Sequence, residues 1–578
     1  MISLTHKRWR VKPRAPKEQF ARLSHLPPVL VQLLYNRGLT DPLEINAFLT
    51  HALPPDNPFR LQDMSKAVDR IRWAIRRGEH IVVYGDFDAD GVTSSALMAS
   101  TLQALGANVR VYIPHRVDEG YGLNKRAIKK IADAGAHVLI TVDCGIRSVE
   151  EVLYAQALGL DVILTDHHSV GPQIPPAYAV INPKREDDSY PFKGLAGVGV
   201  AFKLAQALLR VEQHVPLRKR GEVDLTEAEL LDLVALGTVA DIVPLTGENR
   251  SLVARGLERL NHPQRPGLLA LMEAAGVHPG TVDTMTIGFM LAPRLNAAGR
   301  LSSAKIAYRL LMATELGEAL TLASQLNTLN RQRQYLTQQA VQRAQTQLAE
   351  QADSPLYVVA DPEFLPGIVG LIAGTITTAT YRPTIAIHLE EEQSRGSARS
   401  IPEFHITHAL DQVGDLLVRY GGHAAAAGFT VKNKNLPLLR ARLQEVAWEQ
   451  LGGTLPEPTL EVDMELNLQQ VDWALFEHIR RLAPFGETNP EPLFLSRGVH
   501  VLEARAVGHE GKHLKLRLRA GHRQWPGIAF KLGHLANTLP QRVDLVYHLN
   551  INEWNGQRTL QLVVVDIAAA QEERIVFQ

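Results

Sequence analysis

Residues 81–93 read IVVYGDFDADGVT, a stretch in which an apolar run leads directly into three carboxylates at alternate positions. The apolar run predicts a buried strand, and the carboxylates belong to Asp86, Asp88 and Asp90. Like charges held this close in a crevice repel one another and raise one another's pKa unless a positive charge lies among them. A metal ion is the simplest source of that charge, so the stretch predicts a metal site at the end of a strand.

The chain around this stretch alternates predicted strands with predicted helices. Apolar strands are expected in HIVVYGDF, NVRVYIP, HVLITVD and DVILTD, and segments of helical periodicity separate them. This alternation is typical of a parallel sheet covered on both faces. Functional residues in such sheets lie beyond the carboxyl ends of the strands, where Asp86, Asp143 and Asp166 stand.

Three further motifs add polar groups of the same kind. TVDCGI places Asp143 after a strand, ILTDHHSV adds Asp166, His167 and His168 after another, and ALGTVADIVPL places Asp241 in a turn beyond an apolar helix. Carboxylates and imidazoles together suit Mn²⁺ or Mg²⁺ better than structural zinc, which favours thiolates. A carboxylate that bridges two such ions, about 3.5–4 Å apart, would give a two-metal hydrolytic site for phosphate esters.

The whole chain predicts an α/β protein of several domains. Its 578 residues are too many for one core, and 45% hydrophobic and 21% charged residues are typical of globular proteins. We expect the following parts: an N-terminal helical segment (1–75), the parallel-sheet catalytic domain (76–322), a connecting helix (323–352), a second α/β domain (353–452) and a β-rich terminal domain, interpreted as a small barrel (457–578).

Charge and cysteine content limit the partners and the compartment. The chain has 61 Lys and Arg against 61 Asp and Glu, so a polyanionic partner must be held by local basic surface or by metal. The single cysteine, Cys144, fits a reducing compartment, and its expected role is that of a small buried apolar residue. We expect neither a signal peptide nor a membrane span, and therefore a cytoplasmic protein.

Several of these motifs resemble a known family. DFDADG, TVDCGI, TDHHS and GTVADIVPL resemble the four motifs of the DHH phosphoesterase superfamily, in the same order. LAGVGVAFKLAQAL, APRLNAAGRL and GGHAAAAGF narrow the resemblance to the RecJ family of single-stranded-DNA-specific exonucleases, from about residue 25 to the end. The resemblance implies a DHH domain, a DHH-associated domain that binds substrate, and a terminal oligonucleotide-binding (OB-like) barrel.

The resemblance also implies the ligands of two metal ions, Mn²⁺ or Mg²⁺. Asp88 and Asp143 would hold one ion, and Asp143 would bridge to a second ion held by Asp90, His167 and Asp241. His168 would hydrogen-bond the scissile phosphate or the departing oxygen.

One position departs from the superfamily pattern. Many members carry a histidine four residues before the aspartate that stands here as Asp88, whereas this chain has Tyr84. The first ion would then be short of a ligand, and Asp86 or water would complete its coordination. Such a site is compatible with Mg²⁺, which keeps bound water readily.

Phosphate recognition needs fixed donors, and the guanidinium fork matches phosphate bidentately. The resemblance implies phosphate or DNA contacts for Arg116, Arg294, Asn296, Arg300, Ser397, Arg399 and His423. Arg395, in the same RGSARS segment, is interpreted instead as a solvated surface charge. In the terminal domain, HLKLRLRA followed by Trp525 suits single-stranded nucleic acid, although alternating basic residues are also typical of any solvent-facing strand.

These features together predict a metal-dependent 5′→3′ exonuclease that degrades single-stranded DNA to 5′-mononucleotides. The family likeness places this activity in DNA repair and recombination, with a single-strand-binding protein and a helicase as partners. Two other hypotheses remain: a DHH-type phosphatase of short oligonucleotides or cyclic dinucleotides, and a non-catalytic replication scaffold.

Overall fold

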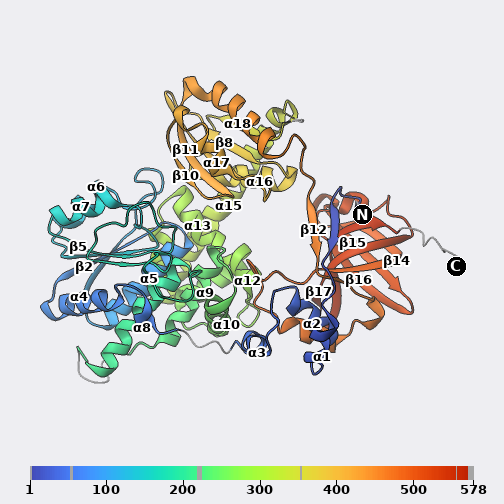
Figure 1. Ribbon diagram of the computed structural model, residues 1–578, viewed down its shortest axis with the longest axis horizontal. Coiled ribbons are helices and arrows are strands. Elements are labelled where there is room, and N and C mark those ends of the chain that lie inside the picture. The colour runs from blue at the N-terminus through green and yellow to red at the C-terminus, as the bar shows by residue number, and fades with distance from the viewer. Residues whose placement is uncertain (1–2, 52–55, 218–223, 352–353, 555, 571–578) are drawn as a thin grey trace. The chain divides into compact units, whose positions relative to one another are not determined.

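The computed structural model describes residues 3–51, 56–217, 224–351, 354–554 and 556–570. The chain divides into two compact units. The larger unit comprises residues 53–455 and 486–488, and the smaller unit comprises residues 1–52, 456–485 and 489–578. The elements of both units are labelled in Figure 1.

The first sheet of the larger unit is wholly parallel, as the sequence predicts. Its five strands follow the order β3-β2-β4-β5-β6. The strands are β2 (His80–Gly85), β3 (Asn108–Tyr112), β4 (Val138–Val142), β5 (Asp161–Thr165) and β6 (Ala179–Ile181). Alternate residues of β2 face opposite sides: Ile81 and Val83 lie in one buried cluster, while Val82 and Tyr84 lie in another. Both faces of the sheet are therefore covered.

Helices supply the residues that cover those two faces. The helices that share a cluster with Ile81 include α4 (Met64–Arg77), α5 (Ala89–Ala104) and α8 (Gly197–His214). The other face is covered by α6 (Lys125–Asp133) and α7 (Val149–Ala157).

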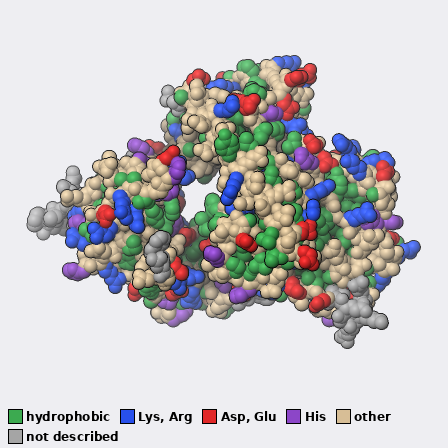
Figure 2. Space-filling model, turned by 180° about the vertical axis from the view of Figure 1, so that it is seen from behind, with side chains coloured by type: hydrophobic (Ala, Val, Ile, Leu, Met, Phe, Trp, Pro, Cys, Tyr) green, Lys and Arg blue, Asp and Glu red, His purple; other side chains and the backbone are tan. Residues whose placement is uncertain are grey.

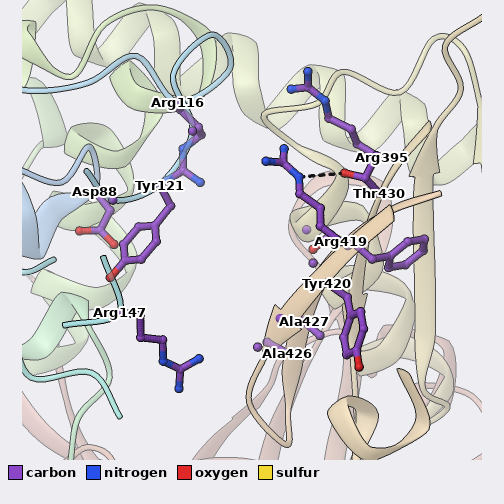
Figure 3. Close-up of a pocket in the computed structure, with 18 of the residues that line it drawn as sticks. Asp88, Arg116, Tyr121, Arg147, Arg395, Arg419, Tyr420, Ala426, Ala427 and Thr430 are labelled. Carbon is purple, nitrogen blue, oxygen red and sulfur yellow. Dashed lines mark hydrogen bonds between the residues drawn. The ribbon is translucent and has the colours of Figure 1, made fainter. Parts of the chain in front are cut away.

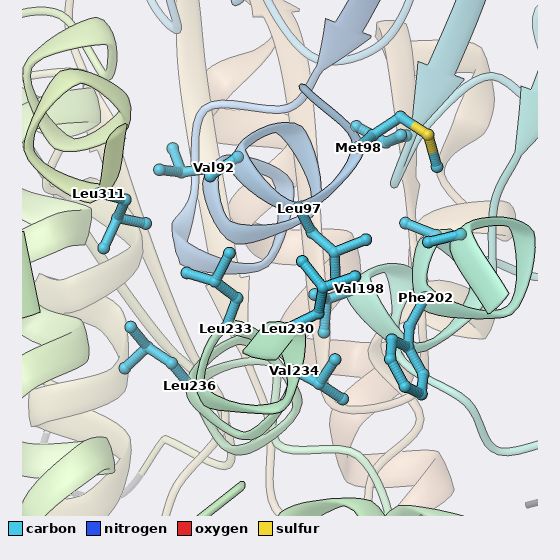
Figure 4. Packing of buried hydrophobic residues seen from close by; sticks show 14 of the residues in the cluster. Val92, Leu97, Met98, Val198, Phe202, Leu230, Leu233, Val234, Leu236 and Leu311 are labelled. Carbon is cyan, nitrogen blue, oxygen red and sulfur yellow. The ribbon is translucent and has the colours of Figure 1, made fainter. Parts of the chain in front are cut away.

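A helical layer extends the first core. It comprises η2 (Glu227–Leu230), α9 (Leu231–Ala240), α10 (Gly247–Asn261), α11 (Pro266–Ala275), α12 (Thr284–Thr286), the π-helical turn η3 (Ile287–Leu291), α13 (Ala292–Leu301) and α14 (Lys305–Met312). Figure 4 shows Val92 and Leu97 of α5 packed beside Leu233 of α9 and Val198 of α8. This apolar packing fixes the N-terminal ends of α5 and α8, which carry part of the site described below.

One long helix connects this core to a second sheet. The helix α15 (Leu316–Ala349) buries Leu322 and Leu326 in the first core and Ala340 and Ala344 against the second sheet. The sheet has the order β10-β11-β9-β8-β7 and is mixed, because only β7 and β8 are parallel. Its strands are β7 (Tyr357–Asp361), β8 (Thr384–His388), β9 (Gln393–Arg399), β10 (Leu417–Gly422) and β11 (Ala426–Lys432). On one face lies α16 (Val369–Thr380), and on the other lie α17 (Ile406–Asp411) and α18 (Leu436–Gln450).

The smaller unit contains a closed five-stranded barrel, which agrees with the predicted OB-like domain. Its strands are β14 (Phe494–Val507), β15 (His513–Ala520), β16 (Arg523–Ala529), β17 (Arg542–Trp554) and β18 (Gln557–Ala569). The strand order ends with β18-β17, and pairing of β14 with β17 closes the barrel. The short strand β13 (Met464–Glu465) extends β14, and α19 (Trp473–Arg480) packs into the same core.

Most of the N-terminal segment belongs to this smaller unit. The strand β1 (Arg8–Val11) pairs in parallel with β12 (Thr459–Val462). The helices α1 (Lys17–Arg22), α2 (Pro28–Tyr35) and α3 (Pro42–Thr50) follow, and buried residues of α2 and α3 share the barrel's hydrophobic cluster. The domain boundaries given above from sequence stay a prediction.

Two surface properties bear on function. On the face shown in Figure 2, Lys and Arg side chains are interspersed with Asp and Glu side chains, which agrees with the zero net charge. Trp525, which the sequence grouped with a surface for single-stranded nucleic acid, is only 6% exposed and lies in the barrel core, because its strand turns it inward. No helix among the described residues is both long and apolar enough to cross a membrane.

Candidate metal centre and phosphate pocket

The carboxyl ends of three neighbouring strands meet at one edge of the first sheet. Gly85 of β2 pairs with Val142 of β4, which pairs with Thr165 of β5, so the residues that follow these strands stand side by side. Those residues include Asp86, Asp143 and Asp166. This register therefore gathers the first carboxylates of the site.

Backbone geometry turns Asp143 toward its neighbours. Its φ of 64° is left-handed, an uncommon conformation for a non-glycine residue that is enriched at functional sites. The first residue of α8, Gly197, lies so close that a Cβ there would collide with the Asp143 carboxylate. Glycine is required at this position because the helix end approaches the carboxylate directly.

The predicted metal ligands converge into overlapping groups. Ligand atoms within each group lie within 4.8 Å of one another, and the groups are Asp86, Asp88 and Asp143; Asp90, His167 and Asp241; and Asp143, His167 and His168. Asp143 belongs to two groups and His167 to two. The chain thus places all six residues proposed as metal ligands in one cluster.

Buried lone pairs show that this cluster fits divalent cations. Asp86 Oδ1, Asp143 Oδ1 and His167 Nε2 are buried without a hydrogen-bond partner among the described residues. His167 Nε2 lies 3.2 Å from Asp143 Oδ1 and 3.6 Å from Asp241 Oδ2. Buried polar atoms without partners are costly, and several that converge on one space indicate a binding site for a positive ion.

The electrostatics of the cluster support the same conclusion. Burial raises the pKa of Asp90 to about 7 and the pKa of Asp241 to about 9, and neighbouring carboxylates contribute to both shifts. Burial and carboxylate neighbours also raise the pKa of Asp143 well above its usual range. Burial lowers the pKa of His167 to about 3, which keeps its imidazole neutral and able to act as a ligand. The carboxylates can be charged together only when a cation lies among them.

Helix ends fix two carboxylates of the DFDADG motif, those of Asp88 and Asp90. Asp88 caps α5 and accepts a hydrogen bond of 3.0 Å from the Gly91 amide. Asp90 accepts hydrogen bonds from the first amides of α8, at 2.7 Å from Gly197 and 2.8 Å from Val198. These contacts leave the carboxylates little freedom to rotate.

Asn296, predicted to contact phosphate or DNA, lies at the back of this motif. Its Oδ1 accepts a hydrogen bond of 2.8 Å from the Ala89 amide. Asn296 is therefore placed to position the motif loop.

His168 is held by Asp166, which the sequence grouped with the strand-end polar residues but did not assign as a metal ligand. Its Nδ1 lies 2.7 Å from Asp166 Oδ1, and Asp166 also accepts hydrogen bonds from the amides of Ile146, His167 and His168. Burial alone would raise the pKa of Asp166, but the hydrogen bond to His168 and the charge of its ring lower it to about 2. Burial alone would lower the pKa of His168, but Asp166 raises it. Asp166 therefore orients His168 and favours its protonated form.

The departure at Tyr84 has a structural reason. Its side chain lies in the buried cluster of the opposite sheet face, stacked on Tyr112 with ring centroids 5.3 Å apart. Its hydroxyl donates to the Gly122 carbonyl oxygen at 2.9 Å and accepts from Asn124 Nδ2 at 3.1 Å. Tyr84 thus anchors the loop that carries Arg116, while Asp86 lies among the carboxylates.

A large pocket opens beside the carboxylates. It has a volume of about 1080 Å³ and is lined by residues of the first sheet's loops and of the second sheet. Figure 3 shows Asp88, Arg116 and Tyr121 on one side of it and Arg419 and other residues of the second sheet on the other. Of the predicted phosphate and DNA contacts, the pocket lining includes Arg116, Arg300, Ser397, Arg399 and His423.

Guanidinium groups crowd one end of this pocket. Arg116 lies over the Phe87 ring, 3.9 Å from its centroid, and Arg399 Nη1 donates to Ser397 Oγ at 3.1 Å. Burial lowers the pKa of Arg300 to about 9, and the charges of Arg116 and Arg399 contribute. Cations packed this closely indicate an anionic ligand.

Arg294 lies outside the pocket lining. Its Nε donates to Asn327 Oδ1 of α15 at 3.1 Å, and its Nη1 donates to the Met290 carbonyl oxygen. The structure thus separates Arg294 and Asn296 from the other predicted phosphate contacts.

Comparison with known proteins identifies the class. Residues 80–238 match the DHH family, N-terminal domain, residues 353–449 match the DHHA1 domain, and residues 462–566 match the RecJ OB domain. These matches and the fold define a protein of the DHH class. The chain is 39% identical over 578 residues to the single-stranded-DNA-specific exonuclease RecJ of Bacillus subtilis, covering 98% of this chain and 71% of that protein. The RecJ of Escherichia coli is 36% identical over 567 residues, covering 94% and 96% of the two chains.

Solved structures agree with this assignment. The crystal structure of RecJ in complex with Mn²⁺ from Thermus thermophilus superposes with a TM-score of 0.82 at 32% identity, covering 98% of this chain and 80% of that one. The corresponding Mg²⁺ complex gives a TM-score of 0.77. The chain belongs to the RecJ family, and the resemblance seen in its sequence motifs is confirmed.

Proposed function

We propose that the protein is a metal-dependent, single-stranded-DNA-specific exonuclease that cleaves in the 5′→3′ direction and releases 5′-mononucleotides. The observation that carries the proposal is the adjacency of two complementary features in one pocket. Asp88, a member of the carboxylate cluster, and the guanidinium groups of Arg116 and Arg300 line the same space. A phosphodiester bound at the carboxylate cluster could therefore keep a terminal phosphate within reach of the guanidinium groups.

The metal ligands proposed here follow the overlapping groups. Asp86, Asp88 and Asp143 would hold one divalent ion, and Asp90, Asp143, His167 and Asp241 would hold the second. Such a pair of ions lowers the pKa of a bound water and neutralises charge on a phosphodiester. The chain's own contribution is to fix these ligands through α5, α8 and the strand ends.

The remaining residues orient the substrate. His168, held by Asp166, would donate a hydrogen bond to the scissile phosphate or to the departing oxygen. Arg116, Arg300, Ser397 and Arg399 would bind the 5′-terminal phosphate. These residues would hold the 5′ end of the DNA strand at a fixed distance from the cleaved bond. That fixed distance would account for the release of one nucleotide at a time and for the polarity of digestion.

Basic residues on the barrel favour a polymeric substrate over a dinucleotide. Lys515, Arg517 and Arg519 point outward at alternate positions of β15, an arrangement suited to the phosphates of a single strand. We place the activity in DNA repair and recombination in the cytoplasm, with a single-strand-binding protein and a helicase that supply the single strand as partners.

Digestion of end-labelled oligonucleotides tests the proposal. Single-stranded and double-stranded substrates are incubated with Mn²⁺, with Mg²⁺ and with chelator. We expect mononucleotides from the 5′ end of the single strand only, and none with chelator. Preferential hydrolysis of dinucleotides would favour the small-substrate phosphatase instead, and metal-independent binding without cleavage would favour the scaffold.

A further inference from the structure

A buried asparagine near the start of α10, Asn249, joins two segments that each carry part of the metal cluster. Its side chain is fully buried. Its Nδ2 donates to the Gly194 carbonyl oxygen at 2.6 Å and to the Pro244 carbonyl oxygen at 3.0 Å. Gly194 belongs to the segment before α8, and Pro244 belongs to the turn between α9 and α10. Asn249 therefore holds together two segments that are distant in the sequence.

The first of these segments, residues 194–198, positions two of the proposed metal ligands. The first amides of α8 donate to the Asp90 carboxylate, and the Leu195 backbone makes a hydrogen bond with the His167 ring. These contacts come from the backbone of the segment and not from its side chains. The position of this backbone therefore decides where both ligands point, and Asn249 binds its first carbonyl group.

The second segment, residues 241–246, begins with a third proposed ligand. Asp241 ends α9, and Ile242 directly after it has a left-handed φ of 59°, which is unusual for a β-branched residue. A residue in this conformation persists only where the surrounding structure holds it there. The hydrogen bond from Asn249 to Pro244, two residues further along, supplies part of that support.

The two segments converge on one ligand group. The ligand atoms of Asp90, His167 and Asp241 lie within 4.8 Å of one another, and each of these residues depends on one of the two segments. Asp88, which belongs to the other group, is held instead within α5 by the Gly91 amide. The bridge made by Asn249 therefore acts on one ligand group more than on the other.

Attachment of α10 to its surroundings has a separate source, the neighbouring Glu248. This buried carboxylate accepts a hydrogen bond of 2.5 Å from the Tyr190 hydroxyl and forms an ion pair with Lys203 of α8. These contacts fix the start of α10 against the loop before α8 and against α8 itself. The contacts of Asn249 are directed at two backbone carbonyl groups close to the metal ligands.

The bridge requires a side chain that donates twice. Two carbonyl oxygens can share the NH₂ group of an asparagine, which has two hydrogens to donate. A carboxylate of the same size only accepts hydrogen bonds when it is ionised, and an alanine offers no donor. Removal of the amide would leave both segments free to shift, and with them the ligands that they carry.

We propose that Asn249 is a positioning residue for one ion of the metal pair, the ion held by Asp90, His167 and Asp241. It sets the spacing between the backbone that holds the first two ligands and the turn that carries the third. The inference rests on the metal centre of the proposed function and adds to it a residue that sets the affinity for one ion. Loss of residues that orient metal ligands typically weakens metal binding about 10–100-fold.

Titration of the metal-free protein with Mn²⁺, followed by calorimetry, tests this role without relying on activity. We expect two binding events in the wild-type protein. In Asn249→Ala one event should weaken about 10–100-fold, while the other stays unchanged. Electron paramagnetic resonance gives a second readout, because two Mn²⁺ ions that share a bridging carboxylate are magnetically coupled. At equal Mn²⁺ concentration, the variant should show less of the coupled signal and more of the isolated ion.

Steady-state kinetics distinguish positioning from general damage to the fold. We expect Asn249→Ala to need about 10–100-fold more Mn²⁺ for half-maximal hydrolysis. Its kcat at saturating Mn²⁺ and its KM for a 5′-phosphorylated strand should change little, because excess metal restores the occupied site. Asn249→Ser, whose hydroxyl can donate to one carbonyl group only, should give a smaller weakening, and it replaces the alanine variant if that protein does not fold.

The matched control is Asn261→Ala at the other end of the same helix. Asn261 Nδ2 likewise donates to two backbone carbonyl oxygens, those of Leu257 and Val282, each at 2.9 Å. This variant should unfold at a lower temperature than the wild type and bind both Mn²⁺ ions normally.

The possible results separate the positioning role from the proposed function. Equal weakening of both binding events in the Asn249 variants, or no weakening of either, would overturn the positioning role. The same weakening in Asn261→Ala would overturn it too, because the effect would then follow from lost stability. A wild-type protein that binds two Mn²⁺ ions but hydrolyses no single-stranded DNA would overturn the proposed function and leave the role of Asn249 intact.

Discussion

Single side chains decide the chemistry of this site, and Asp143 is the central one. It belongs to two of the ligand groups, its backbone is left-handed, and a glycine is required beside it. Asp166 contributes differently, because it holds His168 while its own carboxylate is satisfied by hydrogen bonds. Asp143 would bind metal, whereas Asp166 positions His168.

Replacement of Asp143 by asparagine tests the shared ligand. The amide keeps the size of the side chain but removes the charge needed by both ions, so hydrolysis should fall below detection. Binding of single-stranded DNA should remain, because the basic residues of the pocket and barrel are intact. Turnover and fluorescence anisotropy with a labelled oligonucleotide measure the two effects. Asp69→Asn, an exposed position on α4, is the control, and turnover retained by Asp143→Asn would remove the bridging role.

Asp166→Asn tests the positioning of His168. Loss of the carboxylate weakens the hydrogen bond that orients the ring, so kcat should fall about 10–100-fold. KM should change little, since Asp166 makes no contact with the arginines proposed to bind the 5′-terminal phosphate. Steady-state kinetics on a 5′-phosphorylated single strand separate the two constants. A change confined to KM would mean that Asp166 acts on substrate binding.

At the scale of elements, strand ends and helix ends position the carboxylates of the metal cluster. One anchored loop adds residues that line the phosphate pocket. The loop between β3 and α6 carries Arg116 and Tyr121, and Tyr84 of β2 fixes it from the opposite face of the sheet. The tyrosine at a position where the superfamily often has a metal-binding histidine therefore supports the phosphate pocket.

Tyr84→Phe removes one buried hydroxyl and its two hydrogen bonds. The free energy of unfolding should fall by about 1–2 kcal/mol, because the Gly122 carbonyl oxygen and the Asn124 amide lose their partner. KM for a 5′-phosphorylated strand should rise as the Arg116 loop loosens, while the Kd for Mn²⁺ stays unchanged. Urea denaturation, kinetics and calorimetric titration measure these quantities. Weaker Mn²⁺ binding would contradict the account, because it would place Tyr84 in the metal site.

At the scale of the whole molecule, the larger unit brings two sheets to one pocket, and the metal cluster lies at the edge of the first. The carboxylates are buried together, which stabilises the folded state only when cations balance their charge. The smaller unit combines residues from both ends of the chain in one core, with β1 paired to β12.

Removal of metal should therefore destabilise the protein. An ion that binds only the folded state stabilises it by about 2.7 kcal/mol at a concentration of 100 times its Kd. We expect Mn²⁺ to raise the midpoint of thermal unfolding relative to protein in chelator, and to raise it less in Asp143→Asn. Differential scanning calorimetry measures both. A midpoint that is indifferent to Mn²⁺ in the wild-type protein would contradict a metal centre in this cluster.

Local sequence determined the parallel sheet, the strand-end carboxylates and the family. Apolar runs that end in aspartate are local patterns, and parallel strands necessarily bring their carboxyl ends together. Only the tertiary structure decided what depends on distant partners: that Asn296 contacts Ala89, that Tyr84 faces away from the carboxylates, and that β1 joins the terminal domain. The bridge made by Asn249 depends on two loops that lie beside α10, which periodicity cannot fix because it records which residues are buried and not which segments are neighbours.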